Sequence, residues 1–252
     1  MKKKEKRFAA ILELIENNQF MNIDEMCQIL KVSPATVRRD LAFLEEIAQI
    51  KRVNGGALIS KSQKVELPPV RLLEEKQRIA KAAVDLVNEG DTIFMDGGTT
   101  NLEIASKLAL FSNITIVTTS IELAHKFSQR KDISIFVCGG IMSDVNPKVS
   151  IIGPLAEKMI SYFRANICFL GTSGIHIKNG ITAPYLTSAE VKNVMMRHSA
   201  KSILVADHSK FGKVYSAFVC PVEHFDMMIT DRKAPQEDID QLVSKGVSIK
   251  LV

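Results

Sequence analysis

An anion-binding segment is indicated directly after an apolar run near the middle of the chain. It consists of Asp96, Gly97, Gly98, Thr99 and Thr100, and a helical pattern begins at its end. Backbone N–H groups, two hydroxyls and the positive end of a helix dipole would converge there, which suits a phosphate. The segment has neither the lysine and spacing of a nucleotide P-loop nor a GxGxxG pattern, which disfavours a nucleotide. Taken alone, it fits a structural turn equally well.

Loops of similar composition follow several other apolar runs. They contain Thr119, Gly139, Gly140, Gly171, Asp207 and Lys210. Several such loops together favour a shared crevice, where Lys192 and Lys210 would neutralise a phosphate. Glu190 and Asp207 would accept hydrogen bonds from the hydroxyls of a sugar. For Glu190 and Lys192, an ordinary exposed pair on a helix fits the residues alone slightly better than a ligand contact.

Strands and helices that alternate along residues 74–252 must position these loops. Apolar runs predict strands near residues 92–95, 114–117, 133–137, 167–170, 202–205, 227–230 and 247–251. Amphipathic runs predict helices near residues 74–88, after Thr100, and near residues 155–162, 188–198 and 236–245. This alternation indicates an α/β domain with a mostly parallel sheet covered on both faces. Ligands of such folds gather at the carboxyl ends of the strands, where the loops lie.

The N-terminal part of the chain predicts three short helices, over residues 6–17, 23–30 and 34–46. The third helix has an apolar face, which turns its other face to solvent. The exposed start of this helix carries Ser33, Ala35, Thr36, Arg38 and Arg39. Arginine holds guanine with two hydrogen bonds or contacts a phosphate, so the helix could lie in a DNA major groove. A solvated charged face fits the helix alone equally well.

A basic hairpin after the third helix favours the DNA-binding interpretation. Two predicted strands, residues 50–53 and 57–59, flank a turn made of Asn54, Gly55 and Gly56. Lys51 and Arg52 add positive charge, and the glycines allow the backbone to approach phosphates. Residues 1–64 hold 12 Lys and Arg against 8 Asp and Glu, so most of the net charge of +5 lies here. The pattern is typical of a winged helix-turn-helix domain.

The bulk composition allows two domains. The chain has 252 residues, of which 46% are hydrophobic and 24% charged, as in ordinary globular proteins. We expect a DNA-binding domain over residues 1–60, a linker over residues 61–73 and an effector-sensing domain over residues 74–252. No apolar run is long enough to cross a bilayer and the basic N-terminus lacks the apolar part of a signal peptide, so we expect a cytoplasmic protein. The four separated cysteines suggest no metal site, and no cofactor is indicated.

The N-terminal residues resemble the signature of the DeoR family of bacterial transcription regulators. The matching positions are Arg7, Ile11, Val32, Ser33, Thr36 to Leu41, Leu44, Glu45, Arg52 and Gly55 to Ala57. The likeness continues in the larger domain through Asp96 to Thr100, Gly139, Gly140, Gly153 to Glu157, Phe169 to Gly171, Gly174, Ile175, Ala189 to Lys192 and Asp207 to Gly212. The resemblance implies a sensor domain similar in fold to ribose-5-phosphate isomerase, and a phosphorylated sugar as its effector.

These observations lead to one favoured hypothesis. The protein represses a carbohydrate-utilisation operon by binding double-stranded operator DNA as a homo-oligomer, a dimer or a tetramer, and a sugar phosphate relieves this repression. A sugar-phosphate isomerase or aminosugar deaminase with an added DNA-binding module is the alternative, because Asp96, Glu190, Asp207 and Lys210 are residue types that move protons. The chain offers no recognisable catalytic dyad, which favours a protein without enzymatic activity. A third possibility is a ligand-independent protein-interaction module.

Overall fold

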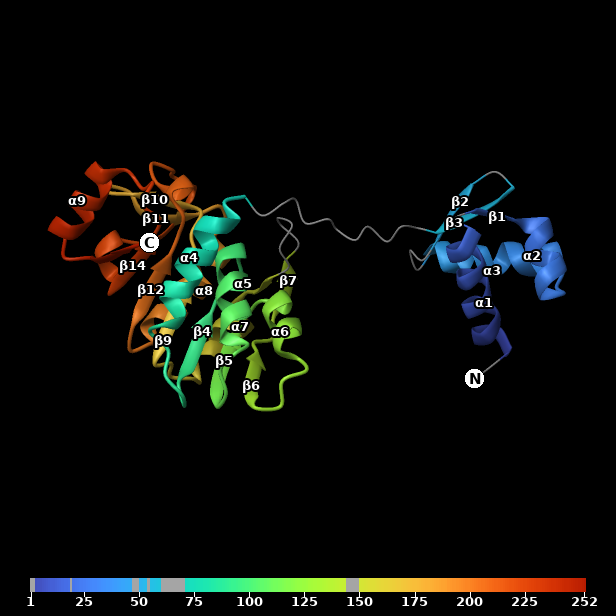
Figure 1. The fold of residues 1–252 in the computed structure, drawn as a ribbon, viewed down its shortest axis with the longest axis horizontal. Coiled ribbons are helices and arrows are strands. Elements are labelled where there is room, and N and C mark those ends of the chain that lie inside the picture. Colours follow the sequence, from blue (N-terminus) through green and yellow to red (C-terminus); the bar gives the residue numbers. More distant parts are fainter. Residues whose placement is uncertain (1–2, 19, 47–49, 54, 60–70, 144–149) are drawn as a thin grey trace. The chain divides into compact units, whose positions relative to one another are not determined.

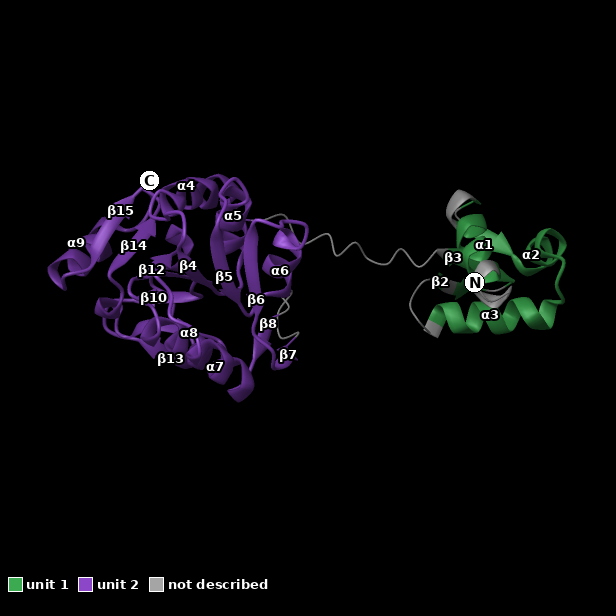
Figure 2. Ribbon diagram, turned by 90° about the horizontal axis from the view of Figure 1, so that it is seen from below, with its two compact units in different colours: residues 1–69 green, residues 70–252 purple. Residues whose placement is uncertain are grey.

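The computed structural model describes residues 3–18, 20–46, 50–53, 55–59, 71–143 and 150–252. The chain divides into two compact units, residues 1–69 and 70–252, which Figure 2 shows in different colours. Most of the predicted linker, residues 61–70, lies outside the described residues, and Leu73 at its predicted end already belongs to a helix. Within the described ranges, no helix has the length and apolar character needed to cross a bilayer.

Unit 1 consists of three helices and a small antiparallel sheet. The helices are α1 (Lys3–Asn18), α2 (Ile23–Leu30) and α3 (Pro34–Glu46). The sheet has the order β1 (Phe20–Asn22), β3 (Gly56–Ile59) and β2 (Ile50–Val53). Apolar residues at helical spacing meet in one core, which contains Ile11, Ile15, Met21, Met26, Val37, Leu41, Leu44, Ile50 and Ala57.

Strand β1 was not expected, and it explains one of the glycines of the hairpin. The hairpin of β2 and β3 forms near the predicted positions. Strand β1 pairs with the edge of β3 that faces away from β2, so that Asn22 lies opposite Gly56. A Cβ atom on Gly56 would lie 2.2 Å from the carbonyl oxygen of Met21. Gly56 is therefore needed because two backbones approach each other closely, and it is buried.

Unit 2 is built on a seven-stranded parallel sheet, shown in Figure 1. Its order is β15 (Ser248–Leu251), β14 (Met227–Thr230), β12 (Ser202–Val205), β9 (Ile167–Leu170), β4 (Thr92–Met95), β5 (Ile114–Thr118) and β6 (Ile133–Val137). Neighbouring strands run parallel throughout. The α/β fold with a parallel sheet, predicted from the alternating pattern, is confirmed.

Helices cover both faces of this sheet. One face packs against α4 (Leu73–Val84), α5 (Thr99–Leu108) and α6 (Ile121–Phe127). The other packs against α7 (Pro154–Ser161), α8 (Leu186–Arg197) and α9 (Gln236–Ser244). Successive side chains of a strand point to opposite faces, so Ile93 and Met95 enter one core and Phe94 enters the other. Burial on both faces explains why these strands are continuously apolar.

Short antiparallel elements are inserted after the carboxyl ends of several parallel strands. A hairpin of β7 (Ile141–Ser143) and β8 (Ser150–Ile152) follows β6. A small sheet combines β10 (Gly174–His176) and β11 (Gly180–Ala183), which follow β9, with β13 (Ala217–Cys220), which follows β12. These elements and α6 were not predicted, because each is short and two of them, β10 and β11, contain glycine. They enclose the end of the sheet where the ligand loops were expected.

The order of the strands reverses between β4 and β9. From β4 the chain continues outward through β5 and β6, and from β9 it continues in the other direction through β12, β14 and β15. At such a switch point the connections leave toward opposite sides, which opens a crevice at the carboxyl ends of the two central strands. The fold therefore places the end of β4, with the segment from Asp96 to Thr100, beside the end of β9.

Replacing Gly56 tests the close approach of β1 to the hairpin. We expect Gly56→Ala to destabilise unit 1 by about 1–3 kcal/mol, because the added methyl group must push β1 away. Gly55→Asn is the control, since Gly55 has a positive φ of 85°, which asparagine tolerates, and has open space around its Cβ position. Chemical denaturation of the full chain, followed by circular dichroism, measures both. Equal stability of Gly56→Ala and the wild type would contradict the observed packing.

Candidate functional site

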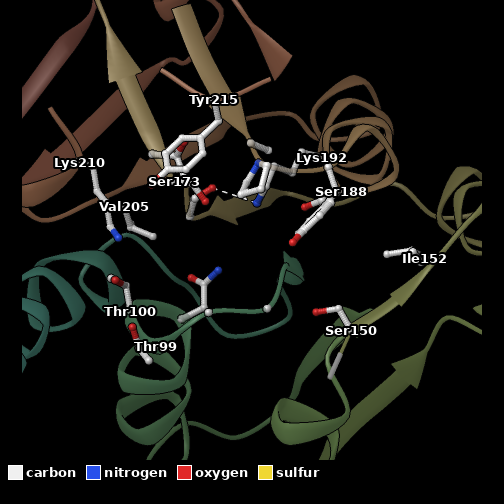
Figure 3. A pocket seen from close by; sticks show the side chains of 18 of the residues that line it. Thr99, Thr100, Ser150, Ile152, Ser173, Ser188, Lys192, Val205, Lys210 and Tyr215 are labelled. Atoms are coloured by element: carbon white, nitrogen blue, oxygen red, sulfur yellow. Dashed lines mark hydrogen bonds between the residues drawn. The ribbon is translucent and has the colours of Figure 1, made fainter. Parts of the chain in front are cut away.

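A cavity of about 630 Å³ opens at the carboxyl ends of the central strands of unit 2. Such a volume suits a small metabolite. In Figure 3 the side chains of Lys210 and Thr100 lie on one side of it, and those of Ser150 and Ile152 lie on the opposite side. The lining residues are Lys76, Gly97 to Asn101, Ser143, Ser150, Ile152, Gly171 to Ser173, Ala183 to Tyr185, Thr187, Ser188, Lys192, Val205, Lys210 and Tyr215.

Asp96 fastens the two central strands together beneath this cavity. One of its carboxylate oxygens accepts hydrogen bonds from the backbone N–H of Gly171, at 3.0 Å, and from the side-chain amide of Asn101. The other oxygen accepts from the Lys192 ammonium, which also donates to the carbonyl of Gly171 at 2.9 Å. Asp96 is buried and both of its oxygens are engaged. It therefore joins the ends of β4 and β9 to the middle of α8.

Burial and the neighbouring carboxylate have opposite effects on the charge of Lys192. Burial lowers the pKa of Lys192 to about 8, because a charged group loses its hydration inside the protein. Contact with the Asp96 carboxylate opposes this effect, since an opposite charge favours the ammonium form. A charge at this depth depends on its partner, so Asp96 and Lys192 form one structural unit at the floor of the cavity.

Helix α5 begins at the cavity with open hydrogen-bond donors. Its N-cap is Gly98, which has a φ of 143° and no side chain to cap the helix. The first intrahelical hydrogen bond joins the N–H of Leu102 to the carbonyl of Gly98. The N–H groups of Thr99, Thr100 and Asn101 therefore have no partner within the helix. Together with the helix dipole they form a site that suits an anion.

Asn101 adds an acceptor at the same place. Its side-chain nitrogen donates to the backbone carbonyls of Asp96 and Phe169, at 3.1 Å each. Its side-chain oxygen is buried and has no hydrogen-bond partner among the described residues. Buried polar atoms are rarely left unpaired, so a donor such as a ligand hydroxyl or a water molecule is expected there.

Two further lysines border the cavity near the end of β12. Lys76 of α4 places its ammonium 2.8 Å from a carboxylate oxygen of Asp207, and both residues are buried. Burial by itself would raise the pKa of Asp207, but hydrogen bonds and charges from Lys76, Ser209 and Lys210 outweigh it, so the pKa is lowered. Asp207 also caps the short helix η1 (His208–Lys210) by accepting from the N–H of Ser209 at 3.0 Å.

The lining of the cavity is positive in character. Three lysines line it, and no carboxylate is present among the described lining residues. The acidic partners, Asp96 and Asp207, lie behind the wall and hold two of these lysines. Among the described residues the cavity is thus lined by cations and not by carboxylates, which suits a negatively charged ligand. The described residues contain no group of three or more His, Cys, Asp or Glu placed to hold a metal ion.

Most of the residues proposed from the sequence meet at this cavity. Gly97, Gly98, Thr99, Thr100, Gly171, Lys192 and Lys210 line it. Thr119 lines a smaller adjoining hollow of about 60 Å³, together with Asp96. Asp207 lies behind Lys76. The sequence did not indicate Lys76, Asn101, Ser150, Ser188 or Tyr215, because the first resembles an ordinary helix residue and the others depend on contacts between distant segments.

Six of the proposed residues are absent from the lining of this cavity: Asp96, Thr119 and Asp207, which lie beside it, and Glu190, Gly139 and Gly140. Glu190 lies on α8, but the lining includes its neighbour Lys192 instead. The backbone N–H of Gly139 points to the sulfur of Met159, at 3.0 Å. A Cβ atom on Gly140 would lie 2.7 Å from the carbonyl oxygen of Ile152. The two glycines therefore allow close packing beside β8 and α7, and this packing gives them a structural role apart from the ligand contact that the sequence predicted.

In unit 1, helix α3 presents two arginines to solvent. Arg38 and Arg39 are exposed, as is Ala35, whereas Thr36 is half-buried. Ser33 begins the helix by accepting a hydrogen bond from the N–H of Thr36 at 3.3 Å. On the inner side, the guanidinium of Arg7 from α1 makes two hydrogen bonds to the buried Asp40. This pair fixes α3 on α1 and leaves its outer face free for a partner.

The hairpin is attached to the end of α3. The backbone N–H of Arg52 donates to the Glu45 carboxylate at 2.9 Å, and the Arg52 guanidinium lies 3.8 Å from the same group. Gly55 is exposed, whereas Gly56 is buried against β1, so its expected DNA contact is corrected to a packing role. Asn54 and the side chain of Lys51 lie outside the described residues.

A winged helix-turn-helix unit joined to an α/β domain with a ligand cavity is the organisation of a ligand-responsive transcription regulator. The DeoR-like helix-turn-helix domain matches residues 7–63, and the DeoR C terminal sensor domain matches residues 72–232. The chain belongs to the DeoR family of transcriptional regulators, as the resemblance predicted.

Relatives of known name agree with this assignment. The HTH-type transcriptional regulator GolR of Listeria innocua is 31% identical over 245 residues, which cover 96% of each chain. The glycerol-3-phosphate regulon repressor of Escherichia coli is 30% identical over 253 residues, which cover 99% of each chain. Among solved structures, ribose 5-phosphate isomerase from Plasmodium falciparum matches with a TM-score of 0.39 and 17% identity, over 56% of this chain and 53% of the isomerase.

Removing the Lys192 charge tests the role of the buried pair. We expect Lys192→Met to lower the stability of unit 2 by about 3–5 kcal/mol, because the Asp96 carboxylate is left buried without its cation. The double variant Lys192→Met with Asp96→Asn removes both charges and should recover part of this loss. Urea denaturation of the full chains gives both values. A single variant as stable as the wild type would show that Asp96 does not depend on Lys192.

Proposed function

We propose that this protein is a repressor that binds double-stranded operator DNA through unit 1 and releases it when a phosphorylated sugar occupies the cavity of unit 2. One observation carries the proposal. The open N-terminus of α5 and three lysines meet at the switch point of a parallel sheet, in a chain that also carries a winged helix-turn-helix unit. This combination supports an anionic effector acting on a DNA-binding protein.

The DNA contacts are proposed for the outer face of α3 and for the hairpin. Arg38 and Arg39 lie on the exposed side of a helix whose inner side is held by the core and by Asp40. A helix anchored in this way can enter a major groove without losing its packing. Ser33, Ala35 and Thr36 at its start, and Lys51, Arg52, Asn54 and Gly55 of the hairpin, are proposed to contact bases or the phosphate backbone.

The ligand is proposed to place its phosphate at the start of α5. The N–H groups of Thr99 and Thr100 would donate to it, and Lys76 and Lys210 would balance its charge. The sugar part would then reach the unpaired oxygen of Asn101 and the hydroxyls of residues such as Ser150 and Ser188. A phosphate and a polyol together satisfy the cations, the donors and the acceptor of this cavity.

The name of one relative supports this ligand class. The Escherichia coli relative represses a glycerol-3-phosphate regulon, so its name links a phosphorylated three-carbon compound to control of transcription. For this chain we propose only the ligand class, a phosphorylated intermediate of a carbohydrate-utilisation pathway. The protein is proposed to act in the cytoplasm, where both DNA and such intermediates occur. A two-fold oligomer is part of the proposal, because paired half-sites multiply the specificity that one small winged unit provides.

The cavity is proposed to bind its ligand without converting it. An isomerase or a deaminase needs a base that is free to take a proton. Asp96 and Asp207 are held by Lys192 and Lys76, and the lowered pKa of Asp207 makes it a weak base. Glu190 does not line the cavity. Of the acidic groups that the enzymatic alternative requires, Asp96 and Asp207 thus have structural partners and Glu190 is absent from the cavity lining.

Alanine variants of α3 test the DNA interface. We expect Arg38→Ala and Arg39→Ala each to weaken operator binding by about 1–3 kcal/mol if the guanidinium reads a base, with a smaller effect and a lower salt slope if it contacts a phosphate. Arg197→Ala, an exposed arginine of unit 2, is the matched control and should bind like the wild type. Fluorescence anisotropy with DNA selected from a random pool provides the affinities. Unchanged affinity in both α3 variants would exclude the proposed placement of the helix.

Calorimetry tests the ligand class. The full chain is titrated with glycerol 3-phosphate, ribose 5-phosphate and fructose 6-phosphate, and with the same compounds without phosphate. We expect at least one phosphorylated compound to bind roughly 100-fold more tightly than its unphosphorylated counterpart, because two charge-assisted hydrogen bonds are lost with the phosphate. The recovered ligand should be chemically unchanged. Equal binding of both forms would reject the phosphate site, and turnover of the ligand would favour the enzymatic alternative.

A further inference from the structure

The chain enters unit 2 at a turn that is directly connected to the cavity. Arg71 and Leu72 precede α4, and residues before them lead back to unit 1. The ammonium of Lys76, in the first turn of α4, donates to the carbonyl oxygen of Arg71. The same ammonium is paired with Asp207, and Lys76 lines the cavity. One buried cation therefore contacts the entry turn, a loop at the end of the sheet and the ligand space.

Two ion pairs fix the first turn of α4 to loops at the carboxyl end of the sheet. Lys76 is held by Asp207, which follows β12, and Glu75 is held by Lys233 at 2.7 Å, in the segment after β14. Glu75 and Lys76 are both buried, although charged residues in the first turn of a helix are usually exposed. The start of α4 is thus attached to the cavity wall by charged side chains rather than by apolar packing alone.

The entry turn itself is held in an unfavourable backbone conformation. Leu72 has a φ of 58° and a ψ of 45°, in the left-handed region, and it provides no side-chain cap for α4. This region is costly for a residue with a branched side chain, so surrounding contacts must maintain it. The hydrogen bond from Lys76 to the carbonyl of Arg71 lies directly before this residue. Loss of that hydrogen bond would let the turn relax.

We propose that Lys76 couples occupancy of the cavity to the segment that leads to the DNA-binding unit. A phosphate at the start of α5 attracts the Lys76 ammonium, which gives up the Arg71 carbonyl, and the turn at Leu72 then leaves the left-handed conformation. The inference rests on the proposed function, because it assumes that a bound phosphate compound changes DNA affinity. It adds the residue through which that change passes.

The physical basis is competition for one ammonium group. The Lys76 ammonium donates to the Arg71 carbonyl and forms an ion pair with Asp207 at 2.8 Å, so a phosphate that draws it into the cavity competes with the Arg71 carbonyl for its N–H groups. A phosphate carries more charge than a carbonyl oxygen and forms stronger hydrogen bonds with an ammonium. The ligand then has different contacts in the two states of the turn, which is the condition for shifting an equilibrium between them.

A comparison of two lysine variants tests the inference. Wild type, Lys76→Met and Lys210→Met are each brought to saturation with the phosphorylated compound that binds best among glycerol 3-phosphate, ribose 5-phosphate and fructose 6-phosphate, with saturation checked by calorimetry. DNA affinity is measured with and without this compound at equal ionic strength. The ratio of the two affinities reports coupling and is independent of how tightly each variant binds the ligand.

The wild type should lose DNA affinity by a factor of about 5–150 at saturation, the usual range for coupled sites. Lys76→Met should change by less than about twofold, whereas Lys210→Met, which removes a cation from the same cavity, should keep the wild-type ratio. An unchanged ratio in Lys76→Met would overturn the inference while leaving the proposed function intact. A wild type that binds none of the compounds, or binds one without losing DNA affinity, would overturn both.

A second variant and a second measurement distinguish a loss of coupling from a misfolded variant. Lys76→Met leaves the buried Asp207 without its ion-pair partner, so the double variant Lys76→Met with Asp207→Asn is examined in parallel and should also show no coupling. Hydrogen exchange at the N–H of Lys76, which donates to Leu72, reports the turn directly. In the wild type the ligand should speed this exchange, and in the double variant it should not. Equal acceleration in both would contradict the role of Lys76.

Discussion

The reversal of strand order between β4 and β9 is the constraint on which the rest of unit 2 depends. It produces a crevice at the carboxyl ends of these strands. At the bottom of this crevice Asp96 accepts hydrogen bonds from Gly171, Asn101 and Lys192. A single buried carboxylate thereby links the loops that follow two strands and fixes the position of a buried ammonium. The start of α5, the lysines and the surrounding hydroxyls then occupy places around this floor, which gives a cavity that suits a phosphate.

The sequence predicted the regular part of this architecture because local patterns determine it. Strands that are buried on both faces appear as apolar runs, and the predicted strand from Ser202 to Val205 coincides with β12. Helix α3 also coincides with its prediction, because Ser33 and Pro34 mark its start. The family resemblance added the type of ligand, which the residues alone did not identify.

The sequence did not show which side chains would meet. Lys76 and Asp207 lie far apart in the chain and become partners only when α4 packs near the end of β12. Gly56 and Gly140 resemble flexible loop glycines, yet both are needed where another backbone lies close. Short strands such as β1 and β13 are formed by pairing with distant segments, so they carry little local signal. The sequence predicted a site at the strand ends, where the structure has a cavity, but the contacts of its individual residues depend on these distant pairings.

We propose that binding of the cavity ligand and binding of DNA weaken each other in this protein. By linkage, a ligand that weakens DNA binding must itself bind more weakly when DNA is present, by the same factor. Calorimetric titration of the phosphorylated compound into the free protein and into the DNA-bound protein measures this directly. We expect a lower ligand affinity in the DNA complex, by the factor that the DNA titrations give. Identical ligand affinity with and without DNA would contradict it.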